Sequence, residues 1–170
     1  MLRSAVTNVI LRELGAVRRS VEAYPDDVSP WVEHPGMPNS GGNLALHVAG
    51  NLRHFVGLTL GQVAYVRDRD SEFSRRAGTR ADLVAGLDAA RAAVERGMAA
   101  VSDGMLAEPY PEKVGGRQLS TGDFLVHLAV HLAYHLGQLD YHRRAVTGER
   151  QGVGALATSE LGVWDGTGRP

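Results

Sequence analysis

Apolar residues recur at every third or fourth position along four segments of the chain, the spacing that places side chains on one face of an α-helix. In the first segment Val6, Ile10, Val17 and Val21 follow this period. The predicted helices span residues 2–24, 43–65, 79–103 and 120–147. No segment carries a strand signal of alternating apolar and polar residues. The pattern predicts an all-α protein, folded as a four-helix bundle in a single domain over residues 1–170.

Short polar motifs mark where two of these helices begin. Ser120 with Asp123, and Thr79 with Asp82, have the spacing of a capping box, in which side chains bond the free backbone N–H groups of the first turn. Gly148 follows the fourth helix and suits the left-handed conformation that ends many helices. These residues predict helix starts near 79 and 120 and a helix end near 147.

The connections between the predicted helices differ in composition. Residues 25–42 hold four prolines and Trp31, so we expect a long ordered loop with the tryptophan packed on the bundle. Residues 67–78 are charged and aperiodic, which predicts an exposed connection. The gap of about 14 residues there favours a crossover along the bundle over a tight hairpin. Residues 148–170 form an irregular tail.

The fourth predicted helix carries a row of histidines. His127, His131 and His135 recur every four residues, so their side chains lie along one face, and His142 lies two turns further on. Two imidazoles one turn apart can bind the same ion from one helix. His127 and His135 cannot, because about 12 Å of helix rise separates them. A shared ion therefore needs an adjacent pair, with His142 too distant to join it.

A third histidine on another helix would complete such a site. His47 lies early in the second predicted helix, and neutral imidazole is the commonest protein ligand for zinc, nickel and similar ions. The chain contains no HExxH motif and no Glu-x-x-His, which excludes a zincin or a ferritin-like di-iron centre. The pattern favours a mononuclear three-histidine site, whose fourth position is left for water or substrate.

Composition narrows the classes of function. The formal net charge is −1, so the chain offers no basic surface for nucleic acid or an anionic membrane. Cysteine is absent, which excludes disulfides, zinc ribbons, iron–sulfur clusters and cysteine nucleophiles. No run reaches the ~20 apolar residues of a membrane span, and the N-terminus lacks the apolar core of a signal peptide. We therefore expect a cytoplasmic protein that acts on a small molecule.

Two stretches resemble the DinB-like (YfiT-type) superfamily of metal-binding four-helix bundles. They are LALHVAGNLRHFVG in the second helix and VHLAYHLGQL in the fourth. The resemblance implies that the metal ligands are His47 and the pair His131 and His135, which precedes Gly137 and Gln138. It extends over nearly the whole chain.

The resemblance also implies an activity. Similar proteins use mycothiol, bacillithiol or glutathione in S-transferase or isomerase reactions, with the thiol bound at a divalent metal ion. Zinc and nickel are the expected metals here, and a homodimer is the expected assembly. Two alternatives remain open: a metal-activated hydrolase, in which the ion lowers the pKa of water, and a non-catalytic metal-binding stress-response protein.

Three residues beside the predicted ligands are candidates for catalysis. Tyr134 and Gln138 flank the histidine face of the fourth helix, and Asn51 follows His47 by one turn. Each is also a common polar residue of helices, so their chemistry does not by itself assign a role.

Two spatial expectations follow from antiparallel second and fourth helices. The open face of the site should be built by the loop 25–42 and the C-terminal tail, with Trp31 and Trp164 as candidate walls. His54 and His127 should reach similar levels below the metal and form a polar pair, because buried imidazoles need partners.

Overall fold

The computed structural model describes residues 2–161, and within that range it is all-helical, with five α-helices and no β-strand. The α-helices are α1 (Leu2–Glu22), α2 (Gly41–Leu52), α3 (Arg69–Ser74), α4 (Arg80–Ala100) and α5 (Thr121–Thr147). The all-α class is as expected from the sequence. The number of helices is not, because the six-residue α3 lies in the predicted exposed connection.

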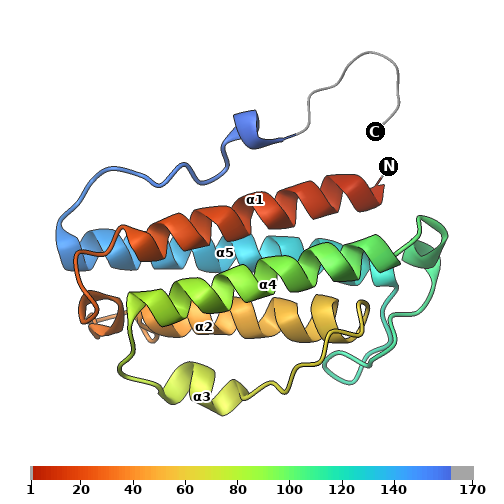
Figure 1. Ribbon diagram of the computed structural model, residues 1–170, viewed down its shortest axis with the longest axis horizontal. Coiled ribbons are helices and arrows are strands. Elements are labelled where there is room, and N and C mark those ends of the chain that lie inside the picture. Colours follow the sequence, from red (N-terminus) through yellow and green to blue (C-terminus); the bar gives the residue numbers. More distant parts are fainter. Residues whose placement is uncertain (1, 162–170) are drawn as a thin grey trace.

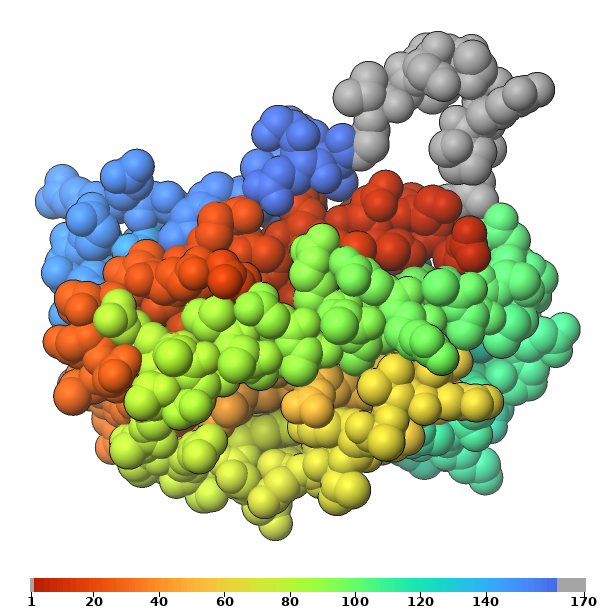
Figure 2. All heavy atoms as spheres, viewed as in Figure 1, coloured from red at the N-terminus to blue at the C-terminus, as the bar shows by residue number. Residues whose placement is uncertain are grey.

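The four longer helices lie side by side (Figure 1), with α1 and α2 each packed against both α4 and α5. In Figure 1, α1 and α5 run in one direction, and α2 and α4 both run in the opposite direction. The neighbours α2 and α5 are therefore antiparallel. Their inward faces share one apolar core. Figure 2 shows the side chains of α1 and α4 meeting along one face of the molecule. Residues that are fully buried in this core include Ile10, Val17, Leu52, Leu87, Leu128 and Leu132.

Side-chain caps set the starts of the helices as the sequence predicted. The Ser120 side chain accepts a hydrogen bond from the backbone N–H of Asp123, and Thr79 does the same for Asp82. Gly148 ends α5 in the left-handed conformation, at φ 74°. These caps confirm the predicted boundaries of α5 and the start of α4. The end of α4 is earlier than predicted, at Ala100 rather than 103.

The second helix is shorter than the predicted 43–65. α2 ends at Leu52, a π-helical segment covers Arg53–Leu58, and Gln62 then breaks the helical path with a φ of 54°. This segment packs closely on α4: a Cβ added at Gly57 would lie 2.7 Å from Cβ of Ala93. The apolar period of the sequence continues through Val63 and so could not show that the helix had ended.

The connection after the π-helical segment returns along the outside of α2 to the start of α4 (Figure 1). Asp68 caps α3 within it by accepting a hydrogen bond from the N–H of Ser71 at 3.0 Å. The prediction that this charged connection is exposed is wrong at Glu72, which is only 5% exposed. Its carboxylate turns inward to α2, as described below.

The described part of the tail runs back along α1. Arg19 donates to the backbone oxygen of Val153 at 2.8 Å and forms an ion pair with Glu160 at 3.0 Å. Trp31 is buried, donates its ring N–H to the oxygen of Gly78 at 2.8 Å, and packs on Gly42.

Candidate metal centre

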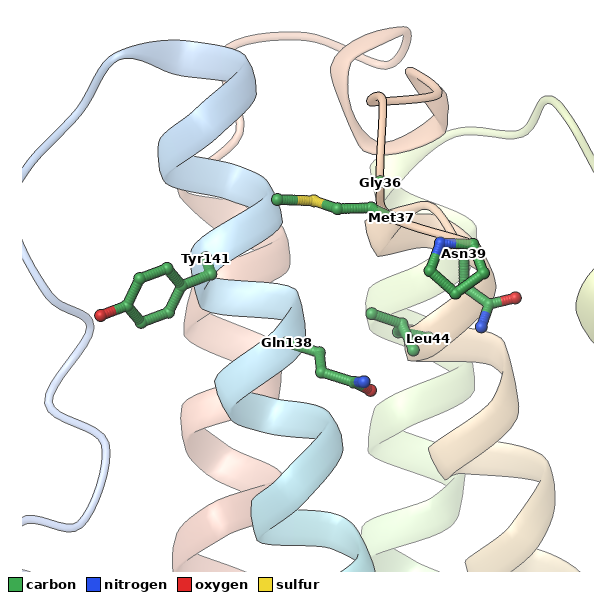
Figure 3. A pocket seen from close by; sticks show the side chains of 7 residues that line it. Gly36, Met37, Asn39, Leu44, Gln138 and Tyr141 are labelled. Carbon is green, nitrogen blue, oxygen red and sulfur yellow. The ribbon is translucent and has the colours of Figure 1, made fainter.

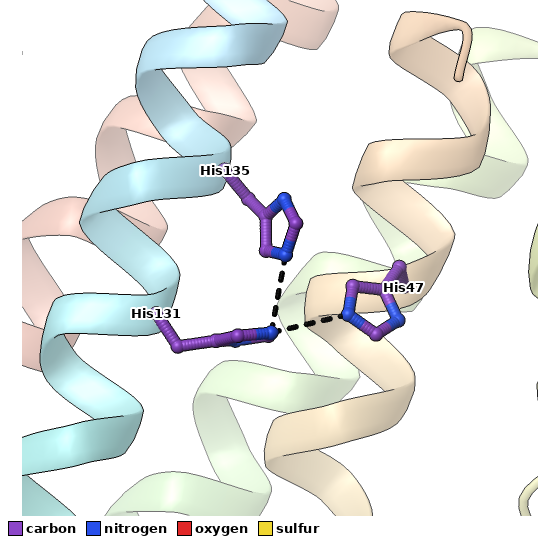
Figure 4. Close-up of side chains that lie close together, drawn as sticks. All are labelled: His47, His131 and His135. Atoms are coloured by element: carbon purple, nitrogen blue, oxygen red, sulfur yellow. Dashed lines mark hydrogen bonds between the residues drawn. The ribbon is translucent and has the colours of Figure 1, made fainter. Parts of the chain in front are cut away.

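Three histidine side chains converge in the space between α2 and α5 (Figure 4). Nε2 of His131 lies 3.3 Å from Nε2 of His47 and 3.1 Å from Nε2 of His135. One ring nitrogen from each residue falls within 4.8 Å of the others. The one-turn spacing on α5 aligns its pair, and the packing of α2 on α5 brings His47 to the same level. The group is compatible with a single metal ion.

The opposite ring nitrogens of His47 and His135 are hydrogen-bonded to acceptors. Nδ1–H of His47 donates to Oε2 of Glu72 at 2.9 Å, and Nδ1–H of His135 donates to the amide oxygen of Gln138 at 2.7 Å. A carboxylate and an amide oxygen only accept, so the proton of each of these rings lies on Nδ1. Their Nε2 atoms therefore present lone pairs to the centre. This is the tautomer that metal-ligating histidines commonly adopt, and it fits the donor set to a divalent ion.

Burial keeps the imidazoles of His131 and His135 neutral. Loss of solvent lowers the pKa of His131 to about 4, helped by the positive charge that protonation of His135 or His47 would bring close. Burial also lowers the pKa of His135, although the hydrogen bond to Gln138 opposes the shift. Because only the neutral ring binds a metal, the pair on α5 is prepared for ligation at neutral pH.

An ion pair from the connection before α4 supports His47 from behind. Arg67 donates to both carboxylate oxygens of Glu72, from Nε at 2.7 Å and from Nη2 at 2.8 Å. Burial by itself would raise the pKa of Glu72, but hydrogen bonds from Arg67 and His47 lower it overall. The carboxylate thus stays charged beside His47. The sequence does not reveal this pair, because nothing in a run of alternating charges distinguishes a buried glutamate.

The comparison with known protein families agrees with this geometry. A model of the DinB superfamily matches residues 11–139, about three quarters of the chain. The chain belongs to the DinB superfamily. The matched range contains all three histidines together with Gln138. No curated protein matches this DinB-superfamily chain in sequence.

The catalytic candidates lie at different depths in this DinB-superfamily protein. Gln138 is hydrogen-bonded to the predicted ligand His135. Tyr134 is 64% exposed, and its ring lies edge-on to that of His135, with 5.4 Å between centroids. Asn51 is buried one turn beyond His47. Their catalytic roles stay predictions.

A pocket of about 200 Å³ lies next to the centre, at the end of the molecule where α2 begins (Figure 3). Leu44 precedes His47 by three residues and Gln138 follows His135 by three, so both lie about one turn from the histidines toward the same end. Figure 3 shows Gln138 pointing from α5 toward Leu44. The pocket is lined by Gly36, Met37, Pro38, Asn39, Leu44, Gln138 and Tyr141.

The expected open face is therefore only partly as predicted. The loop 25–42 does line the pocket, through residues 36–39. Trp31 does not, because it is buried against Gly42 and Gly78. The described tail follows α1 instead. Trp164 lies outside the described residues.

The expected pairing of His54 with His127 is wrong. His54 Nε2 lies 3.2 Å from Oε2 of Glu112, and the hydroxyl of Thr59 donates to the other carboxylate oxygen, Oε1. His127 is exposed and stacks on Phe124 at 5.9 Å between ring centroids. The partner of His54 is thus a carboxylate from the loop before α5 and not the expected His127.

His142 has a structural position apart from the centre, as its distance along α5 predicted. It is buried, accepts a hydrogen bond at Nδ1 from the Tyr24 hydroxyl at 2.6 Å, and donates from Nε2 to the oxygen of Val32 at 2.8 Å. The neutral ring joins α5 to the loop that follows α1.

The described helices include none with both the length and the apolar character needed to cross a membrane.

Proposed function

We propose that this chain is a metal-dependent enzyme that binds one divalent ion, zinc or nickel, through His47, His131 and His135. The observation that carries the proposal is the convergence of three Nε2 atoms, two of which have their opposite ring nitrogen hydrogen-bonded to an acceptor. Three neutral nitrogen ligands with an open fourth position are typical of catalytic rather than structural sites. We take the four longer helices as the predicted bundle, with residues 59–79 as its crossover.

We infer that the reaction is transfer of a low-molecular-weight thiol to an electrophile, or an isomerisation that uses such a thiol. A bound divalent ion would lower the pKa of a thiol in its open position, and the thiolate is the nucleophilic form. The chain has no cysteine, so the thiol must be a separate molecule such as mycothiol, bacillithiol or glutathione. We place the reaction in the cytoplasm, where such thiols are kept reduced.

The residues of the chain have distinct tasks in this proposal. Glu72 holds His47 in the tautomer that ligates through Nε2, and Arg67 keeps Glu72 charged and oriented. Gln138 orients His135 and also lines the pocket, so a substrate group there would contact the same side chain. The pocket of about 200 Å³ has room for a small substituent beside the metal.

Metal content tests the first half of the proposal. The purified protein should bind one equivalent of zinc or nickel by elemental analysis, and His131→Ala should lose most of it. His127→Ala is the matched control, because it removes an imidazole from the same helix one turn away and should retain the metal. Full occupancy in a folded His131→Ala variant would contradict the site.

Turnover tests the second half and separates the alternatives. The metal-loaded protein should consume mycothiol, bacillithiol or glutathione in the presence of a panel of electrophiles. Ester cleavage without thiol would instead favour the metal-activated hydrolase. Metal binding with neither activity would favour the non-catalytic stress-response protein.

A further inference from the structure

The outward face of α5 is apolar along most of its length. Its exposed large side chains recur at helical spacing: Val126 is 42% exposed, Val130 64%, Tyr134 64% and Tyr141 70%. Gly137 lies on the same face, and a Cβ added there would meet nothing within 4 Å. Together these five residues form a single stripe, here called the α5 stripe.

No exposed charged residue interrupts the stripe. Between residues 124 and 143 the only charged side chains are Asp140 and Arg143, and both are buried. The outer face of α4 shows the usual alternative, with Asp88, Arg91 and Glu95 exposed. Contiguous exposed apolar residues on a helix commonly mark an interaction surface. The α5 stripe therefore needs a partner.

We propose that the α5 stripe pairs with the same stripe of a second copy, antiparallel about a two-fold axis at Tyr134. The stripe is self-complementary about that point, as a two-fold interface requires. Val126 and Tyr141 lie at nearly equal distances on either side of Tyr134, so each would face the other across the axis. Val130 and Gly137 form the second such couple, and the open space at Gly137 accepts the valine of the other copy.

Charges at the ends of the stripe favour the same arrangement. Asp123 is exposed at its N-terminal end. Arg144 at its C-terminal end forms an ion pair with Asp140 of its own chain at 2.8 Å, and its side chain is 36% exposed, so it can still approach a second carboxylate. An antiparallel pair brings the carboxylate of one copy near the guanidinium of the other. A parallel pair would instead place the two Asp123 side chains together, which is unfavourable.

The pairing would also reach the metal centre. Tyr134 contacts the ring of His135, and Tyr141 lies at the rim of the pocket next to Gln138. A second α5 over this stripe would cover Tyr141 and narrow the pocket on that side. The pocket would thus be completed by residues of both copies, with Val126 of the second copy at its rim.

Disulfide trapping tests the register, because the natural chain contains no cysteine. Tyr134→Cys should form a covalent dimer under mild oxidation, since residues at the axis approach within the range that a disulfide can bridge. Val126→Cys should not link to itself but should link to Tyr141→Cys when the two variants are mixed. Ala85→Cys, on the exposed face of α4, is the control and should stay monomeric on denaturing gels.

The oligomeric state supplies an independent measurement. Sedimentation equilibrium should show a dimer for the natural chain. Val130→Asp should raise its dissociation constant at least about a hundredfold, because each dimer would bury two unpaired carboxylates. Val130 is 64% exposed in the single chain, so the helical circular dichroism and metal content should not change. A natural chain that remains monomeric over a wide concentration range, or self-linking of Val126→Cys, would overturn the proposal.

Discussion

Replacing Glu72 by glutamine should weaken metal binding although this residue does not touch the metal position. The carboxylate accepts three hydrogen bonds, one from His47 and two from Arg67, at 2.7 to 2.9 Å. Glutamine has a similar shape, but it offers a single oxygen acceptor and turns an amide N–H group toward other donors. At least one of the three hydrogen bonds must therefore be lost.

The size of the effect follows from the kind of bond. A hydrogen bond to a charged group contributes about 1.5–3 kcal/mol, and exchanging a partner behind a histidine ligand typically costs about 10–100-fold in metal affinity. Glu72 and Arg67 have side chains only 6% and 12% exposed, so solvent replaces little of the lost interaction. We expect a loss of about tenfold, which corresponds to about 1.4 kcal/mol.

Competition with a chromophoric chelator at neutral pH measures this affinity for zinc. Asp70→Asn is the matched control, because Asp70 lies on the same helix α3 but is exposed. It removes the same charge from the neighbourhood without disturbing His47, so its affinity should stay close to that of the natural chain. Equal affinities in Glu72→Gln and Asp70→Asn would refute the reasoning, since a general charge effect would then explain any loss.

Three further changes have definite expected outcomes. Gln138→Ala frees Nδ1 of His135 and should lower zinc affinity about tenfold in the same chelator assay, with equal helicity; unchanged affinity would remove Gln138 from the site. Gly97→Ala places a Cβ against the backbone oxygen of Val56 and should lower the free energy of unfolding by about 1–3 kcal/mol in urea titrations, with the metal stoichiometry kept. Burial lowers the pKa of His142 below its ordinary 6.5, so as pH falls through 6.5 the unfolded chain gains a proton that the folded chain does not, and the free energy of unfolding should fall. In metal-free protein His142→Gln should make the free energy of unfolding depend less on pH. An unchanged slope would contradict this role of His142.

Local sequence rules determined most of the helical framework. The caps at Ser120 and Thr79 and the stop at Gly148 act within one helical turn, so their effect can be read without knowing the fold. The alignment of His131 with His135 is equally local, because it depends only on the helical period. These features did not need tertiary information.

Where local rules failed, packing had the deciding role. The apolar period of the second helix continues past its actual end. The π-helical segment and the break that follows lie where Gly57 and Gly61 approach the backbone of α4 closely. His54 was matched with a histidine at the same level, but Glu112 from a loop reaches it instead. The rise per residue of a helix predicts the level of a helical side chain, but it does not predict the position of a side chain on a loop.

In the candidate metal centre, too, some residues follow from the sequence and others only from the tertiary structure. Its pair on α5 is a property of the sequence spacing, and His47 was assigned by resemblance to a family. Glu72 and Arg67 are known only from the tertiary structure, because a short helix outside the four longer ones turns a carboxylate inward to His47. The physical reason is that an ion pair of Arg67 with Glu72 can orient the His47 ring only when it is buried against that ring. Its burial depends on the tertiary packing of α3 on α2.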